Sequence, residues 1–269
     1  MKLRVLVDNN TYIDQYYLGE PAVSYYLETD GLRILFDTGY SDIVLQNAEA
    51  MGIDLGGLTH IVLSHGHNDH TRGLRFLRER FHLSQVQLVA HPGCLRPKWM
   101  DGMDIGAPFG ETEAAAAFDY RPQTGPYALS ENCVFLGEIP ALHDFEPRRC
   151  FGRTLDASGA EIGEFVTDDS ALACRTGDGL FIVTGCSHSG ICNIVDYARQ
   201  VLGEDRVAGV IGGFHLFEAD QRLRQTIGRL KALAPKVLYP CHCVSLRAKA
   251  EMLKALPVEE VGVGLAITL

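Results

Sequence analysis

"IVLSHGHNDH", residues 61–70, joins a short apolar run to three histidines and one aspartate. The apolar run is typical of a short buried β-strand, and the next segment, "TRGLRFLRERF" (residues 71–81), has apolar residues at helical spacing. The polar cluster is therefore predicted to lie where a strand passes into a helix. Neutral imidazoles and carboxylates are the usual ligands of zinc and similar divalent metals, so the cluster predicts a metal site.

The four polar side chains divide into two pairs. His65 and His67 are two residues apart, so they face the same side of an extended segment, and Gly66 permits an unusual backbone between them. Asp69 and His70 follow one turn later and cannot easily bind the same ion. A second ion nearby is the natural solution, because two-metal hydrolytic sites hold their ions roughly 3.5–4 Å apart. The alternative is that these are surface histidines in a polar loop. That explanation is more plausible for a single histidine than for three histidines beside an aspartate.

The composition is that of a globular protein with a sizeable core. The chain has 269 residues, of which 46% are hydrophobic and 22% charged, which suits one large α/β domain or two small ones. The net charge of −10 disfavours nucleic-acid binding, although arginine, lysine or metal could still hold a small anionic substrate. The sequence contains no run of 18 apolar residues, so it predicts no membrane span. The N-terminal "MKLRVLVDNN" resembles a β-strand more than a signal peptide. We therefore expect a cytoplasmic protein whose eight cysteines are reduced.

Hydrophobic periodicity divides the chain into strands and helices. Strands are expected within residues 2–8, 22–29, 31–39, 59–64, 84–92, 133–142, 164–186, 206–216, 236–243 and 261–269. Helices are expected within residues 41–52, 71–81, 193–203, 223–233 and 245–256. Each half begins with strands and ends with alternating strands and helices. This order predicts a single α/β domain, residues 1–269, in which two mixed sheets pack face to face with helices outside, an αββα sandwich.

Residues 95–127 differ from the rest of the chain. They are rich in glycine, proline and acidic residues and include the only tryptophan, Trp99. Loops of this length in a compact domain are usually lids, binding loops or disordered segments. We expect an insertion here, either a solvated loop or a lid over the substrate.

Two motifs together resemble those of a known family. "SHGHNDH" resembles the HxHxDH signature of the metallo-β-lactamase superfamily, and "ILFDTG", which contains Asp37, resembles the first motif of that superfamily. The resemblance implies the αββα fold and a metal site in which Asp37 supports the ligands. It says little about the substrate, because the superfamily includes lactamases, thioesterases, phosphodiesterases, nucleases and redox proteins.

The resemblance also implies ligands in the second half of the chain. Cys186, in "GLFIVTGCSHSG", stands where the superfamily has a bridging aspartate, and His188 follows two residues later. The usual third-motif histidine is absent, and "EFVTDDSAL" offers Asp168 and Asp169 there instead. His242, in "YPCHCVS", is the candidate for the final histidine.

Three later segments narrow the resemblance to a subgroup. "GCSHSGICN", "IGGFHL" and "PCHC" resemble the subgroup often labelled 7,8-dihydropterin-6-yl-methyl-4-(β-D-ribofuranosyl)aminobenzene-5′-phosphate synthase or metal-dependent hydrolase. The chain departs from that subgroup at Pro21, where a histidine would follow the glutamate, and at "HCVS", where "HCTG" is usual.

These observations assign a role to each candidate residue. The predicted ligands of the first ion are His65, His67 and His188, and those of the second are Asp69, His70 and His242. Cys186 would bridge or bind as a thiolate, or is only a small buried residue at a strand end. Asp69, Asp168 or Asp169 could orient the attacking hydroxide, and His215 could protonate the leaving group or be a core histidine.

The resulting hypothesis is a dinuclear metal-dependent hydrolase. Two divalent ions, zinc first with manganese or iron as alternatives, would generate a bridging hydroxide that attacks a small anionic substrate such as a phosphoester. The dihydropterin synthase activity is a second hypothesis, and a non-catalytic metal or redox sensor is a third. The expected partner is a small molecule, without nucleic acid or membrane, and homo-oligomerisation stays open.

Overall fold

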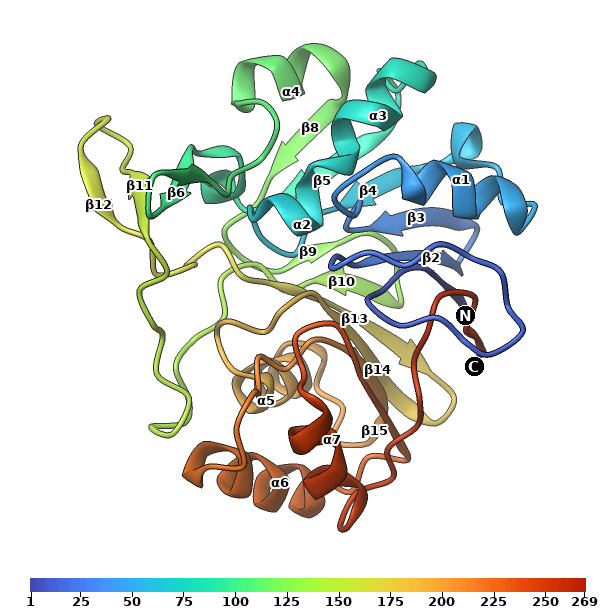
Figure 1. Ribbon diagram of the computed structural model, residues 1–269, viewed down its shortest axis with the longest axis vertical. Coiled ribbons are helices and arrows are strands. Elements are labelled where there is room, and N and C mark those ends of the chain that lie inside the picture. Colours follow the sequence, from blue (N-terminus) through green and yellow to red (C-terminus); the bar gives the residue numbers. More distant parts are fainter.

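The first half of the chain, with the last strand, forms a seven-stranded sheet in the computed structural model, which describes residues 1–269. In sheet order its strands are β17 (Ala266–Thr268), β1 (Lys2–Val7), β2 (Ser24–Thr29), β3 (Leu32–Phe36), β4 (His60–Val62), β5 (Gln87–Ala90) and β8 (Asp119–Pro122). Neighbours from β17 to β3 are antiparallel, and those from β3 to β8 are parallel. Helices α1 (Ile43–Ala50), α3 (Gly73–Arg80) and α4 (Glu111–Ala117) cover its outer side (Figure 1).

The second half forms a six-stranded sheet. In sheet order its strands are β16 (Val237–Pro240), β15 (Val207–Gly212), β14 (Gly179–Thr184), β13 (Ala171–Thr176), β10 (Cys133–Phe135) and β9 (Tyr127–Ala128). The strands β14, β15 and β16 run parallel, and the others pair antiparallel. Helices α5 (Ile191–Leu202), α6 (Gln221–Leu233) and α7 (Leu246–Leu253) lie on the outer side of this sheet (Figure 1).

A buried apolar layer joins the two sheets. Alternate residues of each strand point inward. Ile34 and Phe36 of β3 therefore meet Leu172 and Phe181 of the second sheet in one cluster of 19 buried residues. Leu35, between the first two, points outward into a separate cluster under the helices. Burying each such side chain stabilises the fold by about 1.5–3 kcal/mol. The predicted αββα sandwich is confirmed.

The segment 95–127 contains short regular elements, and its residues Met100 and Ile105 line the cavity described below. Its apolar residues Phe109, Ala114 and Phe118 are buried, which anchors α4, and β8 then extends the first sheet as a parallel strand. A third, small sheet has the order β12 (Glu161–Gly163), β11 (Arg153–Leu155), β6 (Lys98–Met100) and β7 (Met103–Asp104). The first part of the segment therefore forms a hairpin of its own, paired with residues 153–163.

Parallel strands from both sheets end at one edge of the sandwich. Asp37 follows β3 and His65 follows β4 in the first sheet. Cys186, His215 and His242 follow β14, β15 and β16 in the second sheet. The short helix α2 (Asn68–Thr71) and the 3-10 helices Leu55–Gly57 and Pro92–Leu95 complete the secondary structure. The topology thus brings the polar residues of distant motifs to the same edge.

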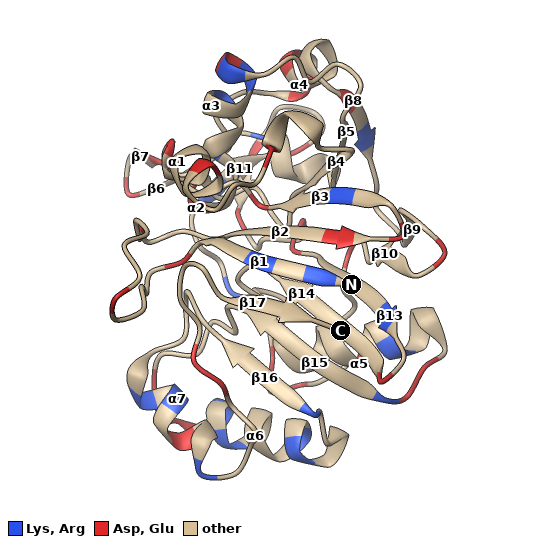
Figure 2. Cartoon of the chain, turned by 90° about the vertical axis from the view of Figure 1, so that its right-hand side faces the viewer, with Lys and Arg blue, Asp and Glu red and all other residues tan.

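Charged side chains are dispersed on the outside of the molecule. Figure 2 shows lysines and arginines on the outer helices and near strand ends, mixed with acidic residues, while most of the strand surface carries neither. None of the helices has the length and apolar character that a membrane-spanning helix needs.

Candidate metal centre

Asp37 anchors the ligands from the first sheet. Its Oδ1 accepts a hydrogen bond from the Ser64 backbone N–H at 2.7 Å, and its Oδ2 accepts one from the Ser64 hydroxyl at 2.7 Å. The same Oδ2 lies 2.7 Å from His70 Nδ1, and both side chains are fully buried. Burial alone would lower the pKa of His70, but the charges of Asp69 and Asp37 raise it well above its ordinary value. Asp37 holds the proton of His70 on Nδ1, so that Nε2 faces the centre and would give up its own proton to a bound cation.

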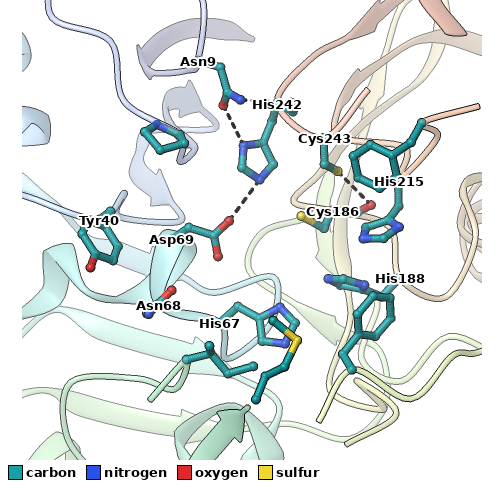
Figure 3. Close-up of a pocket in the computed structure, with 15 residues that line it drawn as sticks. Asn9, Tyr40, His67, Asn68, Asp69, Cys186, His188, His215, His242 and Cys243 are labelled. Atoms are coloured by element: carbon teal, nitrogen blue, oxygen red, sulfur yellow. Dashed lines mark hydrogen bonds and ion pairs between the residues drawn. The ribbon is translucent and has the colours of Figure 1, made fainter. Parts of the chain in front are cut away.

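A first group of donor atoms contains Asp69, His70, Cys186 and His242, whose candidate ligand atoms all lie within 4.8 Å of one another. His70 Nε2 is 3.3 Å from Cys186 Sγ. Asp69 Oδ2 is 3.2 Å from His242 Nε2 (Figure 3). Asn9 Oδ1 lies 3.0 Å from His242 Nδ1, which orients that ring. Burial alone would raise the pKa of Asp69, but the charges of His70 and His242 offset it and hold the pKa well below its ordinary value.

A second group contains His65, Cys186 and His188, also within 4.8 Å of one another. His67 lies beside this group, with Nδ1 3.0 Å from His65 Nε2 and its ring centre 5.0 Å from that of His188. Burial holds the pKa of His65 and of His188 well below the ordinary value and lowers that of His67 to about 4. All three rings are therefore neutral at pH 7, the form that binds metals.

Orphaned donor atoms show that this residue set fits a metal. Both ring nitrogens of His188 and Nε2 of His67 are buried without a hydrogen-bond partner. Unpaired buried polar atoms are rare because each loses its hydration without compensation. Five imidazoles, one carboxylate and one thiol form the donor set that zinc and similar ions prefer. The structure thus brings six of the seven predicted ligands into two groups that share Cys186, and His67 lies beside the second group.

The backbone at several of these positions lies in the left-handed region. Asp37, Ser187, His215 and His242 have φ between 49° and 57° although none is glycine. Such conformations cost of order 1–3 kcal/mol each and persist at functional sites where the surroundings impose them. Each of the four follows a strand closely, so the turn directs the chain around the centre.

Gly66 is required for close approach rather than for an unusual φ. A Cβ at this position would lie 2.1 Å from the Cys94 carbonyl oxygen and 2.5 Å from Lys98 Cε. The glycine between the two histidines therefore lets neighbouring segments pack directly against the ligand loop.

Asp168 and Asp169 accept hydrogen bonds from the backbone of the two loops that carry the candidate ligands. Asp168 Oδ2 accepts the Gly66 N–H at 2.8 Å and lies 3.3 Å from Lys98 Nζ, and Lys98 Nζ lies 2.9 Å from Glu164. Asp169 Oδ2 accepts the N–H of Ser189 at 2.8 Å, next to His188. Neither aspartate lines the cavity described below. Asp169 Oδ1 is buried without a hydrogen-bond partner, and the catalytic role of Asp169 stays a prediction.

A cavity of about 510 Å³ opens above the donor atoms. Its polar floor contains His67, Asp69, Cys186, His188, His215 and His242, and its walls contain Pro21, Tyr40, Met100, Ile105, Phe151 and Phe217. The His215 ring lies 4.6 Å from that of His188 and 5.1 Å from that of Phe151, measured between centres. Burial and the charge of Arg222 lower the pKa of His215 to about 4. His215 thus faces the cavity, as expected of a residue that contacts substrate.

The fold and this centre together define a class of protein. The family model described as the metallo-beta-lactamase superfamily matches residues 18–137, which include Asp37 and the motif at residues 61–70. The chain belongs to the metallo-β-lactamase superfamily, as the resemblance in its motifs predicted.

Individual relatives cover nearly the whole chain. A 7,8-dihydropterin-6-methyl-4-(beta-D-ribofuranosyl)-aminobenzene-5′-phosphate synthase of Methanocaldococcus jannaschii is 32% identical over 83% of this chain and 80% of its own. A second protein of that organism, the uncharacterized protein MJ0448, is 28% identical over 93% of each chain. Among solved structures, Tm1679, a metal-dependent hydrolase of the β-lactamase superfamily, matches with a TM-score of 0.83 at 27% identity, covering 100% of this chain and 99% of its own.

Proposed function

We propose that the protein is a dinuclear metal-dependent hydrolase of a small anionic substrate, with a phosphoester as the leading candidate. The observation that carries this proposal is that Cys186 belongs to two donor groups at the floor of one cavity. Two adjoining donor sets that share a ligand are suited to two neighbouring ions. The cavity volume of about 510 Å³ suits a small molecule.

Each ion would be held mainly by one group of residues. We assign His65, His67 and His188 to one ion, Asp69, His70 and His242 to the other, and Cys186 to the position between them. Divalent ions bound there would lower the pKa of a water molecule and polarise the carbonyl or phosphoryl oxygen of a substrate. Zinc fits the sulfur and nitrogen donors best, and manganese and iron are the alternatives.

Asp69, in addition to its place at the second ion, and His215 take part in the reaction of the substrate. Asp69 lines the cavity, and its side chain keeps 29% of its exposure, so an oxygen of this carboxylate can also orient an attacking water. His215 lies across the floor, where its ring can donate a hydrogen bond to the leaving oxygen. Asp169 is assigned a different task, which is to fix the loop that carries His188.

Metal analysis with a mutational control tests this proposal. We expect about two ions per chain and hydrolysis of aryl phosphodiester or phosphomonoester substrates by the metal-loaded protein. His67→Ala should lose bound metal and activity together while the fold persists, and the exposed His82→Ala should lose neither. One tightly held ion or none would reject the dinuclear centre, and activity that survives His67→Ala would reject the mechanism.

The synthase activity is the second candidate, because a relative that bears this name is 32% identical to the chain. Pro21, the departure noted in the sequence, lies in the cavity wall, where it would contact substrate. Incubation with a phosphoribosyl donor, a p-aminobenzoyl derivative and a pterin tests this candidate. Product formation without hydrolysis of simple esters would favour the synthase, and the opposite result would favour the hydrolase. Bound metal with neither activity would favour a sensor.

A further inference from the structure

Two cysteines outside the candidate metal centre face each other across the second sheet. Cys133 of β10 is the register partner of Cys174 of β13, and their Sγ atoms lie 3.1 Å apart. Both side chains are fully buried. Cysteine is often buried as a small apolar residue, so burial alone would not distinguish these two. Their direct pairing, which the proposed function does not use, does distinguish them.

The backbone around this cysteine pair has the geometry of a cross-strand pair that is not hydrogen-bonded. The Arg175 N–H donates to the Asn132 carbonyl at 2.7 Å, so the ladder bonds flank the cysteine pair instead of joining it. The carbonyl of Cys133 accepts the Leu129 N–H on its other side. In such pairs the Cα atoms are about 4.5 Å apart, within the range of about 4.4–6.8 Å found for disulfides. The sulfur atoms need to approach by only about 1 Å to form a bond.

The surroundings of the pair suit an uncharged link. Both cysteines belong to the buried apolar layer between the two sheets, together with Phe135, Leu172 and Phe181. A disulfide carries no charge, so it can form here without leaving an unpaired charge in the core, a state that would be strongly unfavourable.

The cysteine pair is also separate from the candidate metal centre. Cys174 lies opposite Phe181 of β14, and that strand continues to Thr184 before it reaches Cys186. At about 3.4 Å per residue, roughly 10 Å of strand separates the pair from the edge where the donor atoms meet. A bond between these cysteines therefore leaves the metal ligands in place.

The short strand β10 provides a route by which an oxidant can reach the pair. It has three residues and lies between β13 and the two-residue edge strand β9 (Figure 1). Edges with few buried contacts open at a low free energy compared with global unfolding. Opening of β9 and β10 would expose Cys133 without unfolding the rest of the sheet.

We propose that Cys133 and Cys174 are a redox site, at which a small disulfide such as oxidised glutathione forms a disulfide bond between β10 and β13. One cysteine thiolate attacks the oxidant, forms a mixed disulfide and releases a glutathione thiolate. The other cysteine thiolate then attacks the protein sulfur of the mixed disulfide, which forms the protein S–S bond and releases the second glutathione. The two cysteine sulfurs are oxidised, the oxidant is reduced to two glutathione molecules, and the two thiol protons pass to them. The bond closes a loop between positions 41 residues apart.

Oxidation of the full chain as isolated tests this redox site. Trypsin cleaves after Arg148 and Arg153, so the two cysteines fall in different peptides. After treatment with oxidised glutathione and alkylation in denaturant, we expect a linked peptide that joins Cys133 to Cys174. Tm should rise by roughly 5–10 °C, reversibly with a thiol reductant, because a closed loop of this size restricts the unfolded chain. Cys174→Ala should lose both changes, and the exposed Cys150→Ala should keep both.

The peptide map of the wild type depends on no variant, so it tests the redox site even if Cys174→Ala does not fold. Alkylation of both Cys133 and Cys174, in a sample in which the exposed Cys150 is fully modified by glutathione, would overturn the proposal. An increase in Tm that persists in Cys174→Ala would also overturn it. Metal content and ester hydrolysis are measured separately, so failure of the proposed hydrolase would not change this result.

Discussion

Asp37 touches no substrate, yet its carboxylate determines how the first-sheet ligands are held. Asp37→Asn keeps the size of the side chain but replaces one of the oxygens that contact Ser64 and His70. We expect zinc affinity to fall about 10- to 100-fold, as is typical when the outer partner of a ligand histidine is lost. Competition with a chromophoric chelator measures this change. Asp101→Asn, in an exposed left-handed turn, should have wild-type affinity, and equal affinities for all three proteins would contradict the assignment.

Cys186 is the residue whose role differs most between the hypotheses. As a ligand, its thiol must lose its proton, although burial raises the pKa of this thiol well above the ordinary value without a cation nearby. Cobalt-substituted protein should therefore show a sulfur-to-cobalt charge-transfer absorption band. Cys186→Ala should abolish this band and lower metal content, whereas exposed Cys150→Ala should preserve both. A band that persists in Cys186→Ala would mean that another thiol, such as Cys243, is the ligand.

Asp169 should make stability depend on pH in the metal-free protein. Burial raises its pKa from 3.8 to about 6, so the folded chain holds this proton more tightly than the unfolded chain. The resulting stability is fully present below the unfolded pKa and is lost as the pH rises through about 6. Asp169→Asn stays neutral and can still accept the Ser189 N–H. Urea unfolding should show it gaining stability relative to the wild type at pH 8 but not at pH 4, and a difference independent of pH would contradict this account.

At the residue scale, the sequence predicted which polar residues meet at the site better than it predicted the cavity around them. His65, His67, Asp69 and His70 share one short motif, and Cys186, His188 and His242 each follow an apolar run, so their common edge was predictable. Phe151, Phe217 and Tyr40 reach the cavity from separate turns. Aromatic residues are equally common in cores, so nothing in their local sequence marked them as cavity walls.

At the scale of the elements, β6 carries a buried lysine that pairs with two carboxylates. Lys98 Nζ contacts Glu164 at 2.9 Å and Asp168 at 3.3 Å, and all three side chains are at most 3% exposed. Lys98→Met leaves two buried carboxylates without their cation, which should lower the free energy of unfolding by about 3–5 kcal/mol. Denaturant titration measures the loss. Lys254→Met breaks only an exposed pair with Glu251 and should change the free energy of unfolding by less than about 1 kcal/mol. Similar values for the two variants would show that the buried network is not coupled to the fold.

The small sheet also marks the limit of prediction at this scale. The long helices and most strands of the two main sheets have clear hydrophobic periodicity and lie where it predicted them, whereas β8 and β9 were not predicted. The strands β6, β7, β11 and β12 have two or three residues each, and the β6–β11 pair joins residues about 50 positions apart in the sequence. Strands this short carry no measurable alternation, so the sequence of residues 95–127 resembled a loop. The contact between Lys98 and Glu164 could not be predicted from the sequence for the same reason.

At the scale of the molecule, bound metal should stabilise the packing of the two sheets. His65, His67 and His70 follow β4 of the first sheet, whereas Cys186 and His242 follow strands of the second. An ion held by both sets would bind the folded chain alone, so its removal should lower the melting temperature, by more for an ion that binds more tightly. Thermal unfolding with and without a chelator measures this difference, and added zinc should restore it. His67→Ala should respond less to the chelator, and a wild type that does not respond would show that the metal makes no link between the sheets.

The division of the ligands between two sheets also bears on how the protein acquires its metal during synthesis. The ribosome releases the motif at residues 61–70 while Cys186 and His242 are still untranslated. The nascent chain therefore presents an incomplete set of donors, from which an ion can dissociate and exchange. Docking of the second half would then surround a bound ion and slow its exit. The metal found in the mature protein should reflect which ions are available when the late strands fold, as well as equilibrium preference.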